Sequence, residues 1–219
     1  MERQVSLNEI SDGKLYTLND MVKADCNDCK GCSACCKGMG SSIILDPLDA
    51  FRIMSNLGLT FEQLLIDKIE LNVVDGIILP NLKMIGPNER CTFLNAESRC
   101  SIHSFRPGIC RLFPLGRYYK DDTFYYFLQV HECKKDNRSK IKVKKWIDTP
   151  DIKRNEKFIN DWHYFLKNLE CKIKESQDNS TAKTVSMYLL KQFYLTPYNT
   201  EKEFYPQFEL RMEEAKSVL

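Results

Sequence analysis

Thiols crowd one short stretch of the sequence, CNDCKGCSACC. Its five cysteines are Cys26, Cys29, Cys32, Cys35 and Cys36. A two-residue gap between thiols is short enough to bring both sulfurs to one centre while the backbone N–H groups of the turn point at them. Thiolates are ligands of zinc and of iron-sulfur clusters in proteins. The spacing therefore predicts that this run binds metal.

The run fits two ligand registers, and both stay open. Read from Cys29 it is CxxCxxCC, whereas read from Cys26 it is CxxCxxCxxxC, the spacing of a bacterial ferredoxin. The ferredoxin motif continues with proline, and Lys37 stands in that place here. Because adjacent Cys35 and Cys36 point in different directions, we expect them to serve two centres, or one to bind metal while the other packs.

A second set of cysteines follows at wider spacing, and its members are Cys91, Cys100, Cys110 and Cys133. These four can complete a site that the first run begins. The nine cysteines of the run and the second set are enough for two four-thiolate sites with one to spare; buried apolar thiols are the alternative. Cys171 stands alone in the sequence, and we expect it to be a free thiol.

Two metals compete for these ligands. Structural zinc usually takes two CxxC pairs separated by a dozen or more residues, and the first run holds too many thiols for one such knuckle. The ferredoxin-like spacing favours a 4Fe-4S iron-sulfur cluster, with zinc as the alternative cofactor. His103 lies three residues after Cys100, and His131 lies two residues before Cys133. Either histidine is a reserve ligand.

The composition is that of an ordinary globular protein. The 219 residues are 43% hydrophobic and 28% charged, which is enough to bury a core without crosslinks. No apolar run suits a signal peptide or reaches the ~20 residues of a membrane span, so we expect a cytoplasmic protein. In a reducing cytosol, clustered cysteines are more often metal ligands or redox groups than disulfides.

The charge balance gives no support to nucleic acid or a membrane surface as a partner. There are 32 basic and 30 acidic residues, for a net charge of +2. We expect a protein partner or a redox partner of unknown identity. Residues 98–120 hold no acidic side chain, and their basic residues are Arg99, Arg106, Arg111, Arg117 and Lys120. These cations would offset the charge of a four-thiolate site, unless they form a solvated basic loop.

The segment after the cysteine run predicts two short helices. Asp46 can cap the first, Pro47 suits its first turn, and Gly58 suits its end. Thr60 and Gln63 form a capping box for the second helix. We expect little regular structure between residues 26 and 40.

Two hairpins and one edge strand are predicted next. Residues 73–79, VVDGIIL, place an Asp-Gly pair between apolar residues, and residues 117–131 place a Lys-Asp-Asp-Thr turn between aromatic ones. In residues 140–145, lysines alternate with Ile141 and Val143, which favours an edge strand shielded by lysines over a nucleic-acid patch.

The last third of the chain is predicted to be helical. Apolar residues recur at helical spacing from Ile152 to Leu169, with Thr149 as cap and Pro150 at the first position. The polar residues 174–183 indicate a linker or exposed loop. Two further helices are expected near residues 184–194 and 206–217. The predicted fold is α+β, with a small irregular cysteine-rich core of short hairpins and helices in residues 1–147 and a helical region in residues 148–219 that packs on it.

Several motifs occur together in an order that resembles a known family. They are CxxCxxCC from Cys29, C-TFLN from Cys91, C-SIH from Cys100 and FRPGIC-RLFP at residues 105–114. This arrangement is similar to the bacterial and archaeal CxxCxxCC (YkgJ-type) cysteine cluster family of zinc- or iron-chelating domains. The resemblance covers residues 26–133, and longer clostridial-type members are similar throughout.

The resemblance implies a set of metal ligands: Cys29, Cys32, Cys35, Cys36, Cys91, Cys100 and Cys110. Cys26 and Cys133 are added by the spacing of this chain. Arg106 and Pro107 are expected beside the cofactor, Pro107 to fix the loop before Cys110 and Arg106 to hydrogen-bond a sulfur or balance charge. The alternative for both is a simple turn with an exposed arginine.

Three functions remain open. The leading expectation is an iron-sulfur protein with one or two clusters and a redox or accessory role. The second is a zinc-stabilised protein-interaction module. The third is an enzyme that uses the metal, or a relative of a protein-modifying enzyme, since a similar cysteine module occurs in flagellin lysine N-methylases. The chain has no methyl-donor fingerprint, because its only GxG, Gly38 to Gly40, directly follows the cysteine run; the methylase activity is therefore not carried over.

Overall fold

The computed structural model describes residues 6–27, 32–135, 137–176 and 178–219. Its helices are α1 (Leu7–Ile10), α2 (Pro47–Leu57), α3 (Phe61–Asp67), α4 (Gly108–Leu112), α5 (Val143–Ile147), α6 (Ile152–Ser176), α7 (Asn179–Leu190) and α8 (Phe204–Val218). Single turns are η1 (Ala34–Cys36), η2 (His103–Phe105) and η3 (Lys191–Leu195). Its strands are β1 (Met21–Asp25), β2 (Ile69–Val74), β3 (Ile77–Leu82), β4 (Met84–Ile85), β5 (Arg90–Cys91), β6 (Leu115–Lys120), β7 (Thr123–Leu128) and β8 (Ser139–Lys142).

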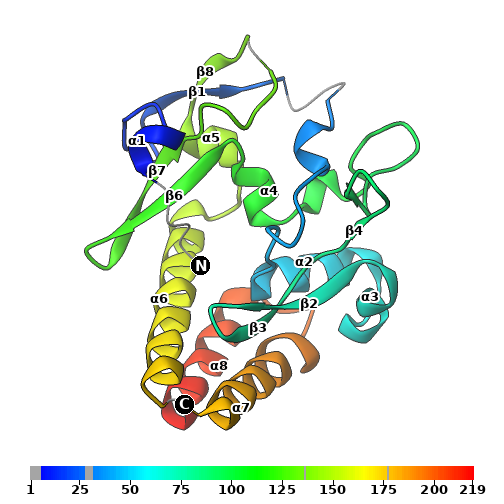
Figure 1. The fold of residues 1–219 in the computed structure, drawn as a ribbon, viewed down its shortest axis with the longest axis vertical. Helices are drawn as coiled ribbons and strands as arrows, with labels where there is room; N and C mark the ends of the chain where they lie inside the picture. The colour runs from blue at the N-terminus through cyan, green and yellow to red at the C-terminus, as the bar shows by residue number, and fades with distance from the viewer. Residues whose placement is uncertain (1–5, 28–31, 136, 177) are drawn as a thin grey trace.

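These elements form an upper and a lower layer in Figure 1. The upper layer holds β1, β8, the β6–β7 hairpin and α5, and the lower layer holds α2, α3, the β2–β3 hairpin and the C-terminal helices (Figure 1). The strands pair antiparallel in twos, as β1 with β8, β2 with β3, β4 with β5 and β6 with β7. The predicted α+β class is confirmed.

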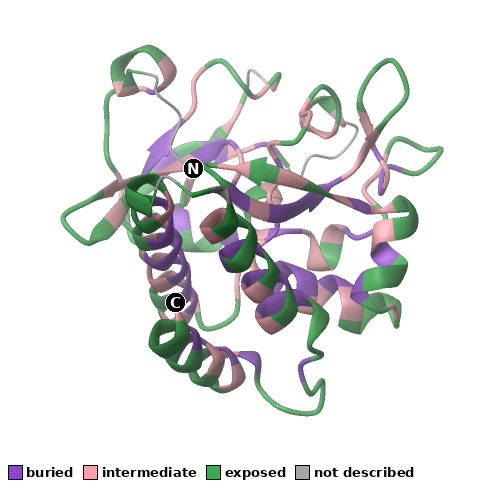
Figure 2. Cartoon of the chain, turned by 60° about the horizontal axis from the view of Figure 1, so that its bottom comes forward, coloured by how far each residue is buried: buried purple, intermediate pink, exposed green. Residues whose placement is uncertain are grey.

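The larger hydrophobic core lies in the lower layer. It joins α2, α3 and β2–β3 to α6, α7 and α8. Aromatic side chains meet edge to face at its centre: the rings of Phe158 and Phe208 are 4.6 Å apart, and those of Trp162 and Phe193 are 4.9 Å apart. Burying each such side chain contributes about 1.5–3 kcal/mol. Buried residues accordingly gather on the inner faces of the helices, whose outer faces are exposed (Figure 2).

A second, smaller core lies in the upper layer. Val22 of β1, Leu115 and Tyr126 of the β6–β7 hairpin and Val143 of α5 pack together there. The indole of Trp146 also belongs to it and donates a hydrogen bond to the carbonyl of Leu112 at 3.1 Å. This bond ties the end of α4 to the upper layer.

The two helices after the cysteine run are confirmed with their caps. Asp46 accepts the N–H of Asp49 at 2.8 Å before α2, and Gly58 ends that helix in the left-handed region at φ 64°. Thr60 and Gln63 form a capping box at the start of α3. Caps involve residues three apart in sequence, which is why they can be predicted locally.

Both predicted hairpins are also confirmed. Asp75 and Gly76 turn β2 into β3 with φ values of 52° and 86°. Asp121 and Asp122 turn β6 into β7 with φ values of 51° and 57°. Positive φ at both central residues is the type I′ arrangement that suits the twist of a hairpin, and Asp and Gly tolerate it.

The predicted edge strand over residues 140–145 is only partly correct. β8 pairs with β1 but ends at Lys142, and α5 begins at Val143. Val143, Trp146 and Ile147 are buried, a spacing of three and four residues that places them on one face of a helix. The lysine alternation suggested a strand, but burial of this face in the smaller core determines the structure.

The long helix is confirmed, but its predicted start is wrong. α6 begins at Ile152, and the N–H of Asn155 bonds to the carbonyl of Asp151 at 3.0 Å. Thr149 and Pro150 lie before the helix, because Asp148, the cap residue after α5, is in the left-handed region at φ 45° and the next residues turn the chain.

The predicted linker over residues 174–183 is wrong in extent. α6 continues to Ser176 and α7 begins at Asn179, with Asp178 accepting the N–H of Ser180 at 2.8 Å as cap. Its polar composition reflects largely exposed helix surface rather than a loop. The two later helices are confirmed as α7, which continues into the π-helical turn η3, and α8.

The boundary at residues 147 and 148 stays a prediction, and the larger core draws residues from both sides of it. Across the described ranges, no helix is long and apolar enough to cross a membrane.

Candidate metal centre

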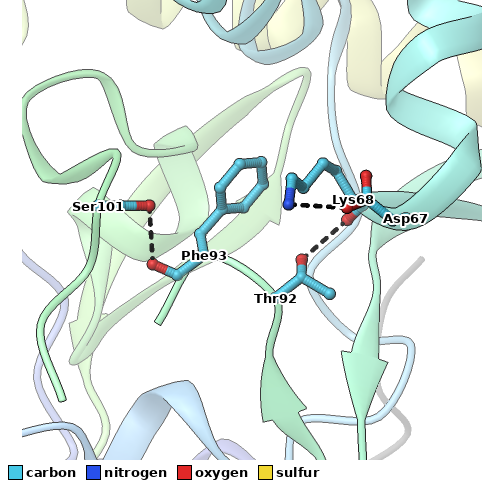
Figure 3. Close-up of polar contacts among 5 residues, drawn as sticks. All are labelled: Asp67, Lys68, Thr92, Phe93 and Ser101. Carbon is cyan, nitrogen blue, oxygen red and sulfur yellow. Dashed lines mark hydrogen bonds and ion pairs between the residues drawn. The ribbon is translucent and has the colours of Figure 1, made fainter. Parts of the chain in front are cut away.

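Cys91 and Cys100 are held together by the loop between them. Leu94 forms an isolated antiparallel bridge with Cys100, and its N–H bonds to the carbonyl of Cys91 at 3.0 Å. Ser101 donates both its N–H and its hydroxyl to the carbonyl of Phe93, at 2.8 and 3.0 Å. Figure 3 shows the Ser101 hydroxyl contact. The loop thus folds back on itself, so that the residues that follow Cys91 lie next to Cys100 and Ser101.

This loop is anchored to the end of α3. The hydroxyl of Thr92 donates to the carbonyl of Lys68 at 3.2 Å (Figure 3). The N–H of Thr92 donates to the carbonyl of Lys83. The ammonium of Lys68 lies 5.9 Å from the centre of the Phe93 ring. On β5, Cys91 pairs with Met84 of β4. Cys91 is therefore fixed by backbone and side-chain contacts on both sides.

The cysteine run comes beside this loop through β5. Lys37 pairs with Arg90, and the N–H of Gly38 bonds to the carbonyl of Glu89 at 3.1 Å. Since Arg90 directly precedes Cys91, the end of the run meets the second set there. The only regular element in the described part of residues 26–40 is the single turn η1, as predicted.

Cys110 is positioned by the short helix α4. Pro107 is buried and precedes the helix, and its carbonyl accepts the N–H of Arg111 at 2.9 Å. The N–H of Gly108 bonds to the side chain of Asp49 at 2.7 Å. Pro107 is thus the residue from which α4 begins, and that helix includes Cys110.

Four thiols are close enough to affect one another electrostatically. Burial, and then the charges of Cys100 and Cys35, raise the pKa of Cys91. The pKa of Cys110 lies well above its usual range because of burial, then the charge of Asp49, and then the charges of Cys91, Cys100 and Cys35. The pKa of Cys100 is raised by burial and by Cys35. A hydrogen bond to Cys36 and burial raise the pKa of Cys35. We call Cys35, Cys91, Cys100 and Cys110 the four-thiol group.

Basic side chains surround this group. Arg106 hydrogen-bonds to the Nε2 of His103, and its charge lowers the pKa of Cys35 and Cys100 against the larger effects that raise them. Arg111 is 9% exposed and donates to the carbonyls of Ser104 and Asp148 at 2.7 and 3.1 Å. The charge of Arg99 also acts on Cys100 and that of Arg90 on Cys91, so deprotonated thiols would find guanidinium charges nearby.

The other predicted ligands are less closely defined. Cys36 is the hydrogen-bond partner of Cys35 and packs on the larger core, and half-buried Cys32 precedes η1. Cys29 lies outside the described residues. Cys26 belongs to the smaller core. Cys133 is half-buried, and its pKa is raised first by burial and then by the charges of Cys26 and Cys35.

Residues outside the ligand set behave as follows. Cys171 is exposed on α6. His131 is exposed, whereas the ring of His103 is engaged by Arg106. Sequence reasoning missed Asp49, which is 3% exposed and whose charge is the largest electrostatic influence on Cys110 after burial. Its place three residues after Asp46, as the second half of a capping box, is the signal that could have singled it out.

The donor set is sulfur, which fits zinc or an iron-sulfur cluster better than a hard cation such as magnesium. Within the described ranges, no three His, Cys, Asp or Glu side chains already stand in an arrangement that holds an ion. The four thiols are thus neighbours, held by separate elements, without being in coordination geometry.

A comparison with known families agrees with this arrangement. Residues 28–172 match the CxxCxxCC family, whose description reads "Putative zinc- or iron-chelating domain". No curated protein and no solved structure matches the chain significantly. The match covers more than half of the chain and includes the four-thiol group, Cys36 and Cys133. The chain therefore belongs to the CxxCxxCC family of metal-chelating domains.

Proposed function

We propose that this protein binds an iron-sulfur cluster of the 4Fe-4S type through thiolates from both cysteine sets. The observation that carries the proposal is that backbone bridges bring the two cysteine sets together, Lys37 beside Arg90 and Leu94 beside Cys100. The charge of Cys35 accordingly acts on Cys91, Cys100 and Cys110. Burial alone disfavours a thiolate, so a bound cation would supply the charge that lets these thiols ionise.

Iron is favoured over zinc by the density of the first run. Cys26, Cys29, Cys32 and Cys36 are separated by two, two and three residues, which is the ferredoxin spacing. A single zinc ion takes four ligands, fewer than the five thiols of this run. The nine cysteines before α6 would allow one or two clusters. Cys26 and Cys133, whose charges interact, are the candidates for a second centre.

Arg106 and Pro107 would flank the cluster, Arg106 by offsetting thiolate charge and Pro107 by starting α4. Hydrogen bonds and charges around the sulfurs tune the potential of a cluster, which supports a redox or accessory role. We propose a cytoplasmic protein that works with a protein or redox partner rather than with nucleic acid or a membrane.

The second candidate is a zinc-stabilised interaction module. The observation that favours it is that four thiols are also the full complement of a closed structural zinc site. In that case the metal would hold η1, the Cys91–Cys100 loop and α4 together around a partner-binding surface. No reacting group is assigned in either case, and a role in an enzyme stays a third possibility.

The test is metal and sulfide analysis of full-length protein purified without oxygen, together with its absorption spectrum. Iron with matching acid-labile sulfide and a broad band near about 400 nm supports the cluster, and its stoichiometry decides between one and two. Colourless protein with zinc supports the interaction module. Protein with neither metal after purification and reconstitution would overturn both candidates.

A further inference from the structure

The start of α4 is held by a side chain from another element. The N–H of Gly108, the first residue of α4, donates to Oδ1 of Asp49 at 2.7 Å. Asp49 lies in the first turn of α2 and is 59 positions away in sequence. This hydrogen bond joins the N-termini of two helices, one of which carries Cys110.

Asp49 is itself rigidly placed. Its side chain is buried, at 3% exposure, and its Oδ2 accepts the N–H of Asp46 at 3.3 Å, while its own N–H is accepted by Asp46. A buried carboxylate that forms specific hydrogen bonds has few alternative orientations. The position of α2 therefore determines where the Asp49 side chain holds the start of α4.

The far end of α4 is fixed independently. Arg111 bonds to two carbonyls outside the helix, and Trp146 bonds to the carbonyl of Leu112. Cys110 lies between these anchors and the start of the helix. Loss of the Asp49 contact would therefore free the beginning of α4 while its end stays attached, and the Cys110 thiol would move relative to the other thiols.

We propose that Asp49 is a positioning residue of the metal centre, whose buried carboxylate fixes the start of α4 and thereby aims the Cys110 thiol at the metal. The inference rests on the proposed metal binding and holds for either metal. Residues that orient metal ligands typically change metal affinity about 10–100-fold when they are removed.

The experiment uses full-length protein from cobalt-supplemented cultures, because cobalt bound by thiolates absorbs through sulfur-to-metal charge transfer. Retained cobalt under chelator competition reports affinity, and absorbance per bound cobalt reports thiolate ligation. Asp49→Ala should lower affinity at least tenfold and absorbance by about a quarter, one of four thiolates.

The matched control is Thr60→Ala, which removes half of the equivalent capping box at the start of α3 and leaves Asp46 and Asp49 intact. It should lose helix stability while keeping the cobalt affinity within threefold and the absorbance per cobalt unchanged. Asp49→Asn keeps an oxygen for the Gly108 N–H and should restore most of the absorbance.

A second pair of variants serves if Asp49→Ala does not fold. Gly108→Pro removes the donor of the same hydrogen bond at a first helical position, where proline is tolerated, and should weaken the charge-transfer band. Gly108→Ala keeps the donor, and its added Cβ would lie 3.6 Å from Asp49 Oδ1, an ordinary contact. It should leave the band unchanged.

Unchanged affinity and absorbance in folded Asp49→Ala, or an equal loss in Thr60→Ala, would overturn this inference while the proposed function stands. In the second pair, equal bands in Gly108→Pro and Gly108→Ala would overturn it in the same way. Wild-type protein that binds neither cobalt, zinc nor iron would overturn the proposed function and this inference together.

Discussion

The imidazole of His163 stacks on the phenol ring of Tyr119, with ring centres 3.4 Å apart and planes within 6° of each other. His163 lies on α6 and Tyr119 on β6, so the stack joins the long helix to the hairpin that directly follows α4. The stack holds the imidazole inside the protein, and His163 is accordingly only 5% exposed.

This burial predicts a pH dependence of stability. Burial and the charges of Lys167 and Arg117 lower the pKa of His163 from 6.5 to about 4, against the weaker opposite effect of Glu170. The unfolded chain therefore binds one more proton than the folded chain between these values, and the free energy of unfolding falls as the pH is lowered from about 6.5 to 4.

Urea denaturation at pH 7.5, 6.5, 5.5 and 4.5 measures this slope. His163→Phe keeps a ring for stacking but cannot take up the proton, so its stability should fall less steeply than that of wild type. Exposed His131→Gln should keep the wild-type slope. Identical slopes in wild type and His163→Phe would contradict the prediction.

Replacing Cys110 by Ser should lower both metal content and stability. Losing a ligand removes metal-binding free energy that is also folding free energy. The expected fall in Tm is at least about 5 °C, since 1 kcal/mol shifts Tm by about 2–4 °C in a chain of this size. Cys171→Ser, at an exposed position, is the matched control and should be nearly silent. Unchanged metal content and Tm in Cys110→Ser would remove Cys110 from the ligand set.

Replacing Arg111 by Ala should destabilise the protein by about 2–4 kcal/mol, because the carbonyls of Ser104 and Asp148 lose their donor. Arg111→Lys should restore little, since one ammonium cannot reproduce the two-pronged contact. Arg154→Ala, which breaks the more exposed pair with Glu203 and the contact of the guanidinium with the Tyr205 ring, should cost less, about 1 kcal/mol. Chemical denaturation checks the ranking, and equal effects at both positions would contradict it.

The elements that the sequence predicted correctly depend on neighbours in the chain. The caps at Asp46 and Thr60 act over three residues, and the Asp-Gly and Asp-Asp turns act over two. These choices are made by local backbone chemistry, which a short window of sequence contains.

The elements that were missed depend on distant contacts. β1 was not predicted because its partner β8 follows more than a hundred residues later. The helix α5 formed where lysines suggested a strand, because Trp146 reaches Leu112 in the smaller core. The polar residues around Ser176 suggested a loop, although polar composition fits the exposed surface of a helix equally well.

The candidate site likewise combines features that the local sequence predicts with contacts between distant residues. Clustered thiols could be identified from their spacing, as could Pro107 and Arg106 from the motif around Cys110. The meeting of Cys35 with Cys91 through the Lys37–Arg90 bridge, and the contact of Asp49 with Gly108, required the tertiary structure.

The most direct test of the central claim, that thiolates from both cysteine sets hold one metal centre, is X-ray absorption at the metal edge of the purified protein. The account predicts a first shell of sulfur at about 2.3 Å, and a sulfur count that falls in both Cys35→Ser and Cys91→Ser. A first shell dominated by nitrogen or oxygen at about 2.0–2.2 Å would contradict it, as would a sulfur count that neither substitution changes.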